Sequence, residues 1–411
     1  MQSIRAQPPP AFHRPYSLSR RSHHQSGASL CDDGADCTDD GGVSVRDDIG
    51  ALLRVMPPDI RGLLEEHPQR SSLVEIVLDL GRRPEARFAG QRAESLREEE
   101  VTLEELEAAA SSLGDFGGDN RAGIAGTLHR FSAIRNRRGK VVGLTCRVGR
   151  VVSGHVELIR DFLFADSSSV LFLGAPGVGK TTVIRELARV LADEGRQRVV
   201  VLDTSNEIGG DGDVPHPALG GARRMQVPSL EAQHLTMIQA VQNHMPQVII
   251  VDEVGTEEEA LACRTIAERG VRLIATAHGR TLADLLKNPT LVDLVGGIQS
   301  VTLGDDEARS RGTQKSVLER QGSATFPTLI ELRDRNTWLV HDTELSVDAL
   351  LAGRLPVVEV RSRDATSQKV VISAAQFDVG GQFADSARAS QAPLPPPLAT
   401  SAAPRKGRKG R

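Results

Sequence analysis

The chain has 411 residues, a length that suits two or three domains. Charged residues make up 25% and apolar residues 39%, and no run of about 18 apolar residues occurs, so wholesale disorder and a transmembrane helix are both excluded. The net charge of −4 gives no global attraction to nucleic acid, and 10 Phe, 1 Tyr and 1 Trp are too few to form aromatic platforms on which bases stack.

Four cysteines are too few for a disulfide framework. Cys31 and Cys37 are separated by five residues, whereas Cys146 and Cys263 stand alone. None of them has the spacing of zinc ligands, so we expect a reducing compartment and no structural metal.

The two ends of the chain differ in composition from the part between them. Residues 1–30 contain four arginines, six serines and no acidic residue, which is typical of an organellar transit peptide. Residues 1–45 are therefore expected to form a transit peptide, with a merely disordered leader as the alternative. Residues 366–411 are rich in Pro and Ala and predict a disordered tail. Its basic residues could dock on nucleic-acid phosphates or anionic membranes, or simply be solvated; they are Arg405, Lys406, Arg408, Lys409 and Arg411.

Residues 46–152 predict a small α+β domain. Thr102 and Glu105 have the spacing of a capping box, which indicates the start of a helix. The run SSLVEIVLDLG at residues 71–81 suits either a buried helix or a strand, and the sequence leaves both open. Two β-rich runs lie on either side of residues 136–139, which predicts a hairpin.

The run VLFLGAPGVGKTT at residues 170–182 is the strongest signal in the chain. Four apolar residues of buried-strand type precede a glycine-rich loop, and a helical pattern closed by Gly195 at its C′ position follows the loop. Strand, glycine loop and helix form the context that a phosphate-binding loop requires. We therefore predict a nucleotide site built from Gly174, Ala175, Pro176, Gly177, Val178, Gly179, Lys180, Thr181 and Thr182.

Each part of this loop has its own role in binding phosphate. Gly177 and Gly179 let backbone N–H groups turn toward the phosphates, where a β-carbon would obstruct them. The helix N-terminus adds partial positive charge. Lys180 is expected to reach the β- and γ-phosphates, and Thr181 to offer its hydroxyl to Mg²⁺. No Asn-Lys-x-Asp guanine-reading motif occurs, so ATP is favoured over GTP.

The run PQVIIVDEVG at residues 246–255 predicts a second strand that ends in two carboxylates. Asp252 is expected to hold Mg²⁺, and Glu253 to activate water. Two further apolar runs place Glu207 after one strand and His278 after another, which together predict a mostly parallel sheet with its ligand crevice at the strand ends. Glu207 competes with Glu253 for the water, and Glu253 is preferred because it adjoins Asp252. His278 is expected to sense the γ-phosphate.

Several longer motifs agree in order with a known group of proteins. They include DTSNEIGGDGDVPHPALGGARRMQVP from Asp203, VIIVDEVGTEEEA from Val248, TAHG from Thr276 and NPTLVDLVGGIQSVTLGDDEARSRG from Asn288. With them, about residues 50–360 resemble the plastid and cyanobacterial P-loop ATPases of the conserved chloroplast open reading frame type. These are related to the stage III sporulation AA ATPase and, more distantly, to secretion-type RecA-like ATPases.

The resemblance implies a RecA-like ATPase domain of AAA+ type at residues 153–365, a plastid location, and a ring, with six copies expected, whose nucleotide sites lie between subunits. Such a site needs a cation from the neighbour to offset transition-state charge. Members of the plastid group often carry a C-terminal Arg-x-x-x-His domain that binds nucleic acid, but no histidine follows His341, so that property is not carried over. The candidate cations, all expected in polar loops, are Arg223, Arg224, Arg309 and Arg311.

These observations predict an α/β, RecA-like P-loop NTPase with a mostly parallel sheet, preceded by the smaller α+β domain. Its expected activity is Mg²⁺-dependent ATP hydrolysis coupled to movement between the subunits of a homo-oligomer. One alternative is a nucleic-acid-associated NTPase, or a nucleotide-gated binding module, that uses the basic tail. A small-molecule kinase is disfavoured, because the Asp252–Glu253 pair favours water activation and no acceptor site is apparent.

Overall fold

The computed structural model describes residues 37–38, 44–165, 167–311, 314–364 and 369–376. All of them belong to one compact unit, Ala35–Arg411. Most of the expected leader, and the tail from residue 377 onward, lie outside the described residues. None of the described helices is long and apolar enough to cross a membrane.

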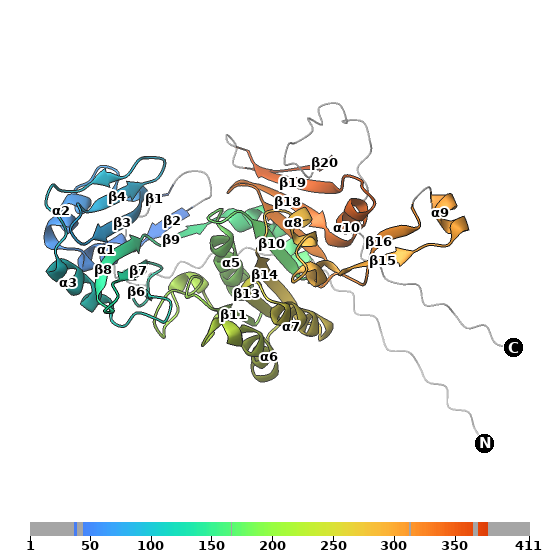
Figure 1. The fold of residues 1–411 in the computed structure, drawn as a ribbon, viewed down its shortest axis with the longest axis horizontal. Helices are drawn as coiled ribbons and strands as arrows, with labels where there is room; N and C mark the ends of the chain where they lie inside the picture. Colours follow the sequence, from blue (N-terminus) through green and yellow to red (C-terminus); the bar gives the residue numbers. More distant parts are fainter. Residues whose placement is uncertain (1–36, 39–43, 166, 312–313, 365–368, 377–411) are drawn as a thin grey trace, which may run out of the picture. The chain divides into compact units, whose positions relative to one another are not determined.

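The first part of the described chain forms a six-stranded antiparallel sheet in the order β5-β4-β3-β8-β7-β6 (Figure 1). Its strands are β3 (Leu73–Asp79), β4 (Glu85–Phe88), β5 (Glu94–Ser95), β6 (Arg121–Gly123), β7 (Arg130–Arg135) and β8 (Val141–Arg147). Three helices supply the rest of an aliphatic core: α1 (Ile49–Val55), α2 (Pro58–Glu65) and α3 (Leu103–Leu113). A small antiparallel sheet of β1 (Cys37–Thr38), β2 (Ser44–Asp47) and β9 (Arg150–Ser153) accompanies it.

Local sequence signals explain much of this part. The run at residues 71–81 forms strand β3, because its buried positions alternate with more exposed ones, as one covered sheet face requires. The hairpin expected around residues 136–139 is confirmed as β7 and β8, and the capping box of Thr102 and Glu105 is confirmed at the start of α3. The structure differs at Cys37–Thr38, a two-residue strand inside the expected leader.

The second part is a nine-stranded sheet in the order β12-β11-β13-β14-β10-β17-β18-β19-β20. Every pairing from β12 to β17 is parallel, and the last three pairings are antiparallel. The strands are β10 (Val170–Gly174), β11 (Val199–Asp203), β12 (Arg223–Gln226), β13 (Val248–Val254), β14 (Arg272–Ala277), β17 (Thr328–Leu332), β18 (Thr337–Asp342), β19 (Val357–Arg363) and β20 (Val370–Gln376). The expected α/β fold with a mostly parallel sheet and a preceding α+β part is confirmed.

Helices cover both faces of the parallel strands (Figure 1). In β10, Val170 and Phe172 face a core that includes α4 (Arg160–Ala165) and α5 (Lys180–Arg189), whereas Leu171 and Leu173 face the opposite core. That second core includes α6 (Gln233–His244), α7 (Glu257–Glu268), α8 (Leu282–Leu286) and α10 (Thr343–Leu351). Because both faces are covered, the strands read as continuous apolar runs.

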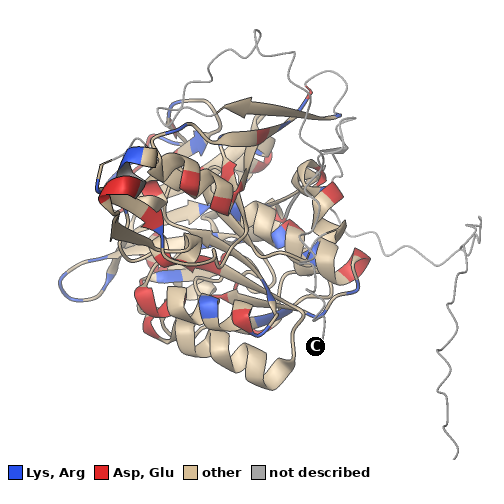
Figure 2. Ribbon diagram, turned by 90° about the vertical axis from the view of Figure 1, so that its right-hand side faces the viewer, with Lys and Arg blue, Asp and Glu red and all other residues tan. Residues whose placement is uncertain are grey.

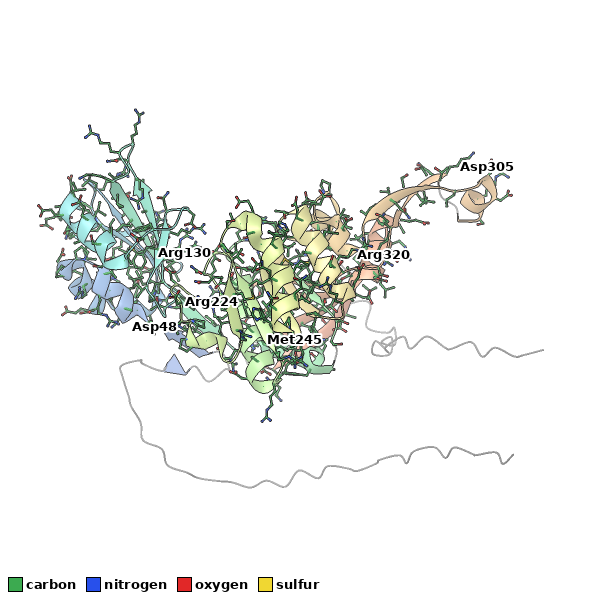
Figure 3. The ribbon with its side chains drawn as sticks, turned by 90° about the horizontal axis from the view of Figure 1, so that it is seen from below. Asp48, Arg130, Arg224, Met245, Asp305 and Arg320 are labelled. Carbon is green, nitrogen blue, oxygen red and sulfur yellow. The ribbon has the colours of Figure 1, made fainter. Side chains whose placement is uncertain are left out.

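Short helical turns connect these elements. The 3₁₀ turns are Arg70–Ser72, His155–Leu158, Pro217–Leu219, Leu230–Ala232 and Val292–Val295. A hairpin of β15 (Ile298–Thr302) and β16 (Ser316–Arg320) carries helix α9 (Asp305–Arg311), and Asp305 lies at its far end (Figure 3).

Two expectations about element ends are wrong. The helix after the phosphate loop continues as a π-helical turn, Val190–Glu194, and Gly195 keeps a right-handed φ of −75°. Arg196, with φ of 49°, takes the left-handed position expected of Gly195. In the expected disordered tail, Val370–Gln376 pairs with β19 along seven residues, so its start is part of the large sheet.

Candidate functional site

The glycine-rich loop joins the carboxyl end of β10 to the first turn of α5. Gly174, Gly177 and Gly179 have positive φ angles of 156°, 75° and 111°, which L side chains rarely adopt. A β-carbon on Gly177 or Gly179 would meet nothing within 4 Å, so backbone conformation alone requires glycine there. At Gly174 a β-carbon would lie 2.9 Å from the carbonyl oxygen of Leu332, so close approach matters too. The other loop residues are Ala175 and Val178, half-buried, and Pro176, exposed.

Lys180 is the first residue of α5 and is half-buried beside this loop. Its Nζ donates a hydrogen bond of 2.6 Å to the carbonyl oxygen of Gly174 and a longer one of 3.4 Å to that of Ala175. Burial lowers the pKa of Lys180, while the negative charges of Glu253 and Asp252 act in the opposite direction. The expected phosphate-binding cation therefore lies in the field of the two carboxylates at the end of β13. Thr181 and Thr182 follow it in the first turn.

Asp252 is almost completely buried, and its carboxyl group is crowded by other acids. Burial and the negative charges of Glu207, Asp203 and Glu253 raise the pKa of Asp252 to about 7, although Arg185 opposes the shift. Three carboxylates acting on a fourth form an environment that a bound cation would stabilise. The donor types fit Mg²⁺, because Asp252 supplies a carboxylate and Thr181 a hydroxyl.

Glu253 has an unusual backbone. Its φ is 55°, and the register between β13 and β14 shifts between Val251 and Val254. The N–H of Glu253 donates to Oγ1 of Thr276 at 3.0 Å, and Nε2 of Gln233 donates to the Glu253 carbonyl at 3.2 Å. These contacts hold a conformation that costs of the order of 1 kcal/mol for a residue other than glycine, and such outliers cluster at functional sites.

The carboxylate of Glu253 contacts Nε2 of His278, and both side chains are more than half exposed. His278 follows β14, the strand that lies between β13 and β10 in the sheet. The next residue, Gly279, accepts a 3.0 Å hydrogen bond from the N–H of Gly174 in the glycine loop. The structure thus brings together the expected water activator, the expected sensor and the loop.

Glu207, the rival of Glu253, lies in the loop after β11 and has a different partner. Its carboxylate forms an ion pair with Arg130 of β7, in the N-terminal sheet. Arg130 was not identified from the sequence, because nothing in its surroundings marks a contact with a residue 77 positions away. The two candidate glutamates are therefore held by different parts of the chain, Glu253 by His278 and Glu207 by Arg130.

Arg185 is a second residue near the site that was not identified from the sequence. It is nine-tenths buried in α5, and its Nε donates a 2.7 Å hydrogen bond to the carbonyl oxygen of Ile208, while the guanidinium also bonds the carbonyl of Glu207. Burial lowers the pKa of Arg185 to about 10, against the attraction of Asp203, Asp252 and Glu207. An arginine among the buried residues of an amphipathic helix is the signal that could have revealed it.

The expectation that the candidate arginines lie in polar loops is wrong. Arg223 and Arg224 belong to β12, the edge strand of the large sheet, and Arg309 and Arg311 belong to helix α9. Arg224 bonds the carbonyl oxygens of Gly210 and Gly212, so it serves the loop after β11. Arg223 and Arg309 are exposed.

The sequence is similar to those of known proteins. Residues 104–325 match the profile of the family described as sporulation stage III, protein AA. Over 318 residues the chain is 57% identical to the uncharacterized protein ycf45 of Porphyra purpurea, covering 77% of this chain and 56% of that protein. It is 55% identical to the protein SEEDLING PLASTID DEVELOPMENT 1 of Arabidopsis thaliana, covering 79% and 48%. The chain thus spans about half the length of these two relatives.

Among solved structures, the pilus retraction motor PilT with bound ADP matches with a TM-score of 0.46 and 15% identity, over 77% of this chain and 83% of that one.

The raised pKa of Asp252 predicts how stability depends on pH without nucleotide or Mg²⁺. Because the folded-state pKa lies above the usual value of 3.8, the folded chain binds more protons between about pH 4 and pH 7, and stability falls as pH rises through that window. Asp252→Asn removes this titration. Between pH 5 and pH 8 the parent should lose about 2 kcal/mol of unfolding free energy through this titration, and the variant should not. The stability of the variant relative to the parent should therefore rise by that amount over the same range.

Urea unfolding followed by circular dichroism at the two pH values measures this difference. The exposed Asp306→Asn makes the same chemical change away from the cluster and serves as the control. If Asp252→Asn changes the free energy of unfolding by the same amount at pH 5 and pH 8, the pKa of Asp252 is not raised in the folded chain.

Proposed function

Because the chain belongs to the stage III sporulation protein AA family, we propose that it is an ATPase that binds ATP with Mg²⁺ at the loop between β10 and α5 and hydrolyses it. One observation carries the proposal: Lys180, beside a glycine loop in the required conformation, lies in the field of Asp252 and Glu253 at the end of β13. A single strand, β14, separates β10 from β13 and contributes His278 just after its end.

Binding follows from the loop and the helix that begins at it. The N–H groups of Gly177 and Gly179 and the N-terminus of α5 attract the phosphates, and the Nζ of Lys180 would exchange its two carbonyl partners for phosphate oxygens. Thr181 and Asp252 are the residues that would hold Mg²⁺. When bound, Mg²⁺ neutralises charge on the phosphates.

Glu253 is the residue we assign to water activation. Thr276 and Gln233 fix its backbone, while its side chain is about half exposed. The carboxylate is therefore held in position and remains accessible to a water molecule. His278, which contacts this carboxylate, is placed to report a phosphate at the loop, because the following residue bonds Gly174. Glu207 remains the alternative base. To activate water, its carboxylate would first have to break its ion pair with Arg130.

The first prediction concerns nucleotide affinity. Lys180→Ala removes the cation that the loop supplies, so ATP affinity should fall at least about 100-fold, as expected for loss of a charge-assisted contact to phosphate. Equilibrium binding of a fluorescent ATP analogue measures it. Lys287→Ala, which removes an exposed lysine at the end of α8, should bind like the parent. Undiminished affinity in a folded Lys180→Ala chain would refute the phosphate-loop assignment.

The second prediction separates the two glutamates. Glu253→Gln keeps the shape of the side chain and removes its basicity, so ATP affinity should survive while turnover falls by roughly 10²–10⁴-fold. Glu207→Gln should lose less turnover. Glu258→Gln, an exposed change in the first turn of α7, should match the parent. The readouts are nucleotide affinity and phosphate release with Mg²⁺ in excess; a larger turnover loss in Glu207→Gln would reverse the two roles.

The third prediction concerns assembly. We propose a ring of six copies in which Arg223 or Arg309, both exposed, offers a cation to the site of a neighbour. Light scattering with MgATP should then give about six times the chain mass of 44.1 kDa, and a monomer mass would contradict the ring.

We also propose residence in the plastid. A fusion of residues 1–45 to a fluorescent reporter should enter plastids, and a diffuse cytosolic signal would contradict this.

A further inference from the structure

Among the described residues, positive charge is concentrated in one stretch of a chain whose net charge is −4. Residues 121–150 contain eight Lys and Arg and no Asp or Glu. Elsewhere among the described residues the two signs are mixed, as the blue and red positions in Figure 2 illustrate. The eight basic residues are Arg121, Arg130, Arg135, Arg137, Arg138, Lys140, Arg147 and Arg150.

The fold places this stretch at one side of the N-terminal sheet. Strands β8, β7 and β6 are neighbours, with β6 at the edge. The register sets Arg130 opposite Arg147, while Phe131 and Cys146, the next pair, point into the core shared with the helices. Because side chains alternate across a strand, the arginine pair lies on the face away from that core.

The hairpin between β7 and β8 presents four exposed cations, Arg135, Arg137, Arg138 and Lys140. Oδ1 of Asn136 accepts hydrogen bonds from the N–H groups of Arg138 and Lys140, at 2.9 and 3.1 Å, and Gly139 takes a φ of 81°. The turn is thereby fixed, with the side chains of residues 135–140 exposed. Among the described residues, no carboxylate forms an ion pair with Arg137 or Arg138.

Acidic neighbours offset part of this charge, and Arg130 is already paired with Glu207. Lys140 pairs with Glu107 at 3.5 Å and Arg121 with Asp119 at 3.5 Å, and all four side chains are more than 40% exposed. Exposed pairs of this kind contribute about 0–1 kcal/mol and are easily exchanged for another anion. Arg147 shares Glu75 with Arg87, so that carboxylate is already divided between two cations.

We propose that the β7–β8 hairpin binds the phosphate backbone of double-stranded DNA. Arginine predominates, and its planar fork matches phosphate oxygens. A two-stranded β-ribbon fits the major groove of B-DNA, whereas the major groove of duplex RNA is too narrow for side chains to read. The one aromatic residue in 121–150 is Phe131, which is fully buried, so bases of a single strand have nothing to stack on there.

A membrane surface fits less well. The five residues of the turn, 136–140, include no apolar side chain that could enter the acyl region, although Ile134 is exposed further along β7. Binding to DNA through this hairpin uses none of the residues assigned to ATP, so it stands independently of the proposed hydrolysis.

The test compares full-length chains with the basic tail present in all of them. Arg137→Ala/Arg138→Ala/Lys140→Ala removes the hairpin cations. The control, Arg82→Ala/Arg83→Ala/Arg92→Ala, removes three exposed arginines from other turns of the same sheet. Anisotropy of a labelled 30-base-pair duplex of arbitrary sequence gives the affinity at several salt concentrations. Circular dichroism checks that each variant is folded.

We expect the hairpin variant to bind at least tenfold more weakly than the parent in moderate salt. The slope of log K against log salt should become shallower by about 2–3, since each lost phosphate contact removes about 0.9 from the slope. The control should match the parent, and Arg137→Lys/Arg138→Lys should retain most of the affinity. Equal affinity and slope in the parent and the hairpin variant would overturn the proposal. So would hairpin-dependent binding to phosphatidylserine vesicles or single-stranded DNA, with none to the duplex.

Discussion

The candidate site depends on one buried guanidinium. Arg185 extends from α5, the helix that begins at the glycine loop, and bonds the carbonyl oxygens of Glu207 and Ile208 after β11. Its charge also attracts Asp203 and Asp252 on the neighbouring strands. Removing it would deprive the carbonyl oxygens of Glu207 and Ile208 of a charged donor, and hydrogen bonds to charged groups typically contribute about 1.5–3 kcal/mol. The loop, the helix and both carboxylate-bearing strands therefore hold their places together.

The sequence predicted what is encoded locally. The phosphate loop lies within a few residues of its strand and helix, and the capping box at Thr102 is a four-residue pattern, so each was found where the structure has it. The parallel sheet followed from continuous apolar runs in strands covered on both faces. The alternation in β3 was too short to separate strand from helix without its partners.

What the sequence did not predict depends on distant or unfavourable contacts. The pairing of Arg130 with Glu207 joins residues far apart in the chain. The edge strand β12, with sequence RRMQ, has no apolar run and so resembled a loop. The left-handed backbone of Glu253 goes against residue preference and is visible only once Thr276 and Gln233 are in place around it.

The N-terminal sheet meets the site through backbone as well as charge. Oδ2 of Asp211, in the loop after β11, accepts a 2.7 Å hydrogen bond from the N–H of Gly123, and Ala125 forms a parallel bridge with Asp211. Gly210 lies so close that a β-carbon would be 2.3 Å from the carbonyl oxygen of Thr127. Strand β7 then runs from Arg130, at Glu207, to Arg135, at the basic hairpin. One strand thus connects the candidate ATP site to the proposed DNA surface.

We propose that this arrangement of loop, lysine and carboxylates hydrolyses ATP. Phosphorus NMR of the full-length chain incubated with ATP and Mg²⁺ tests it most directly, since it identifies every phosphorylated product. We expect equal amounts of ADP and inorganic phosphate, with formation of both stopped when Mg²⁺ is chelated. Unchanged ATP, or transfer of the phosphoryl group to an acceptor without release of inorganic phosphate, would contradict it.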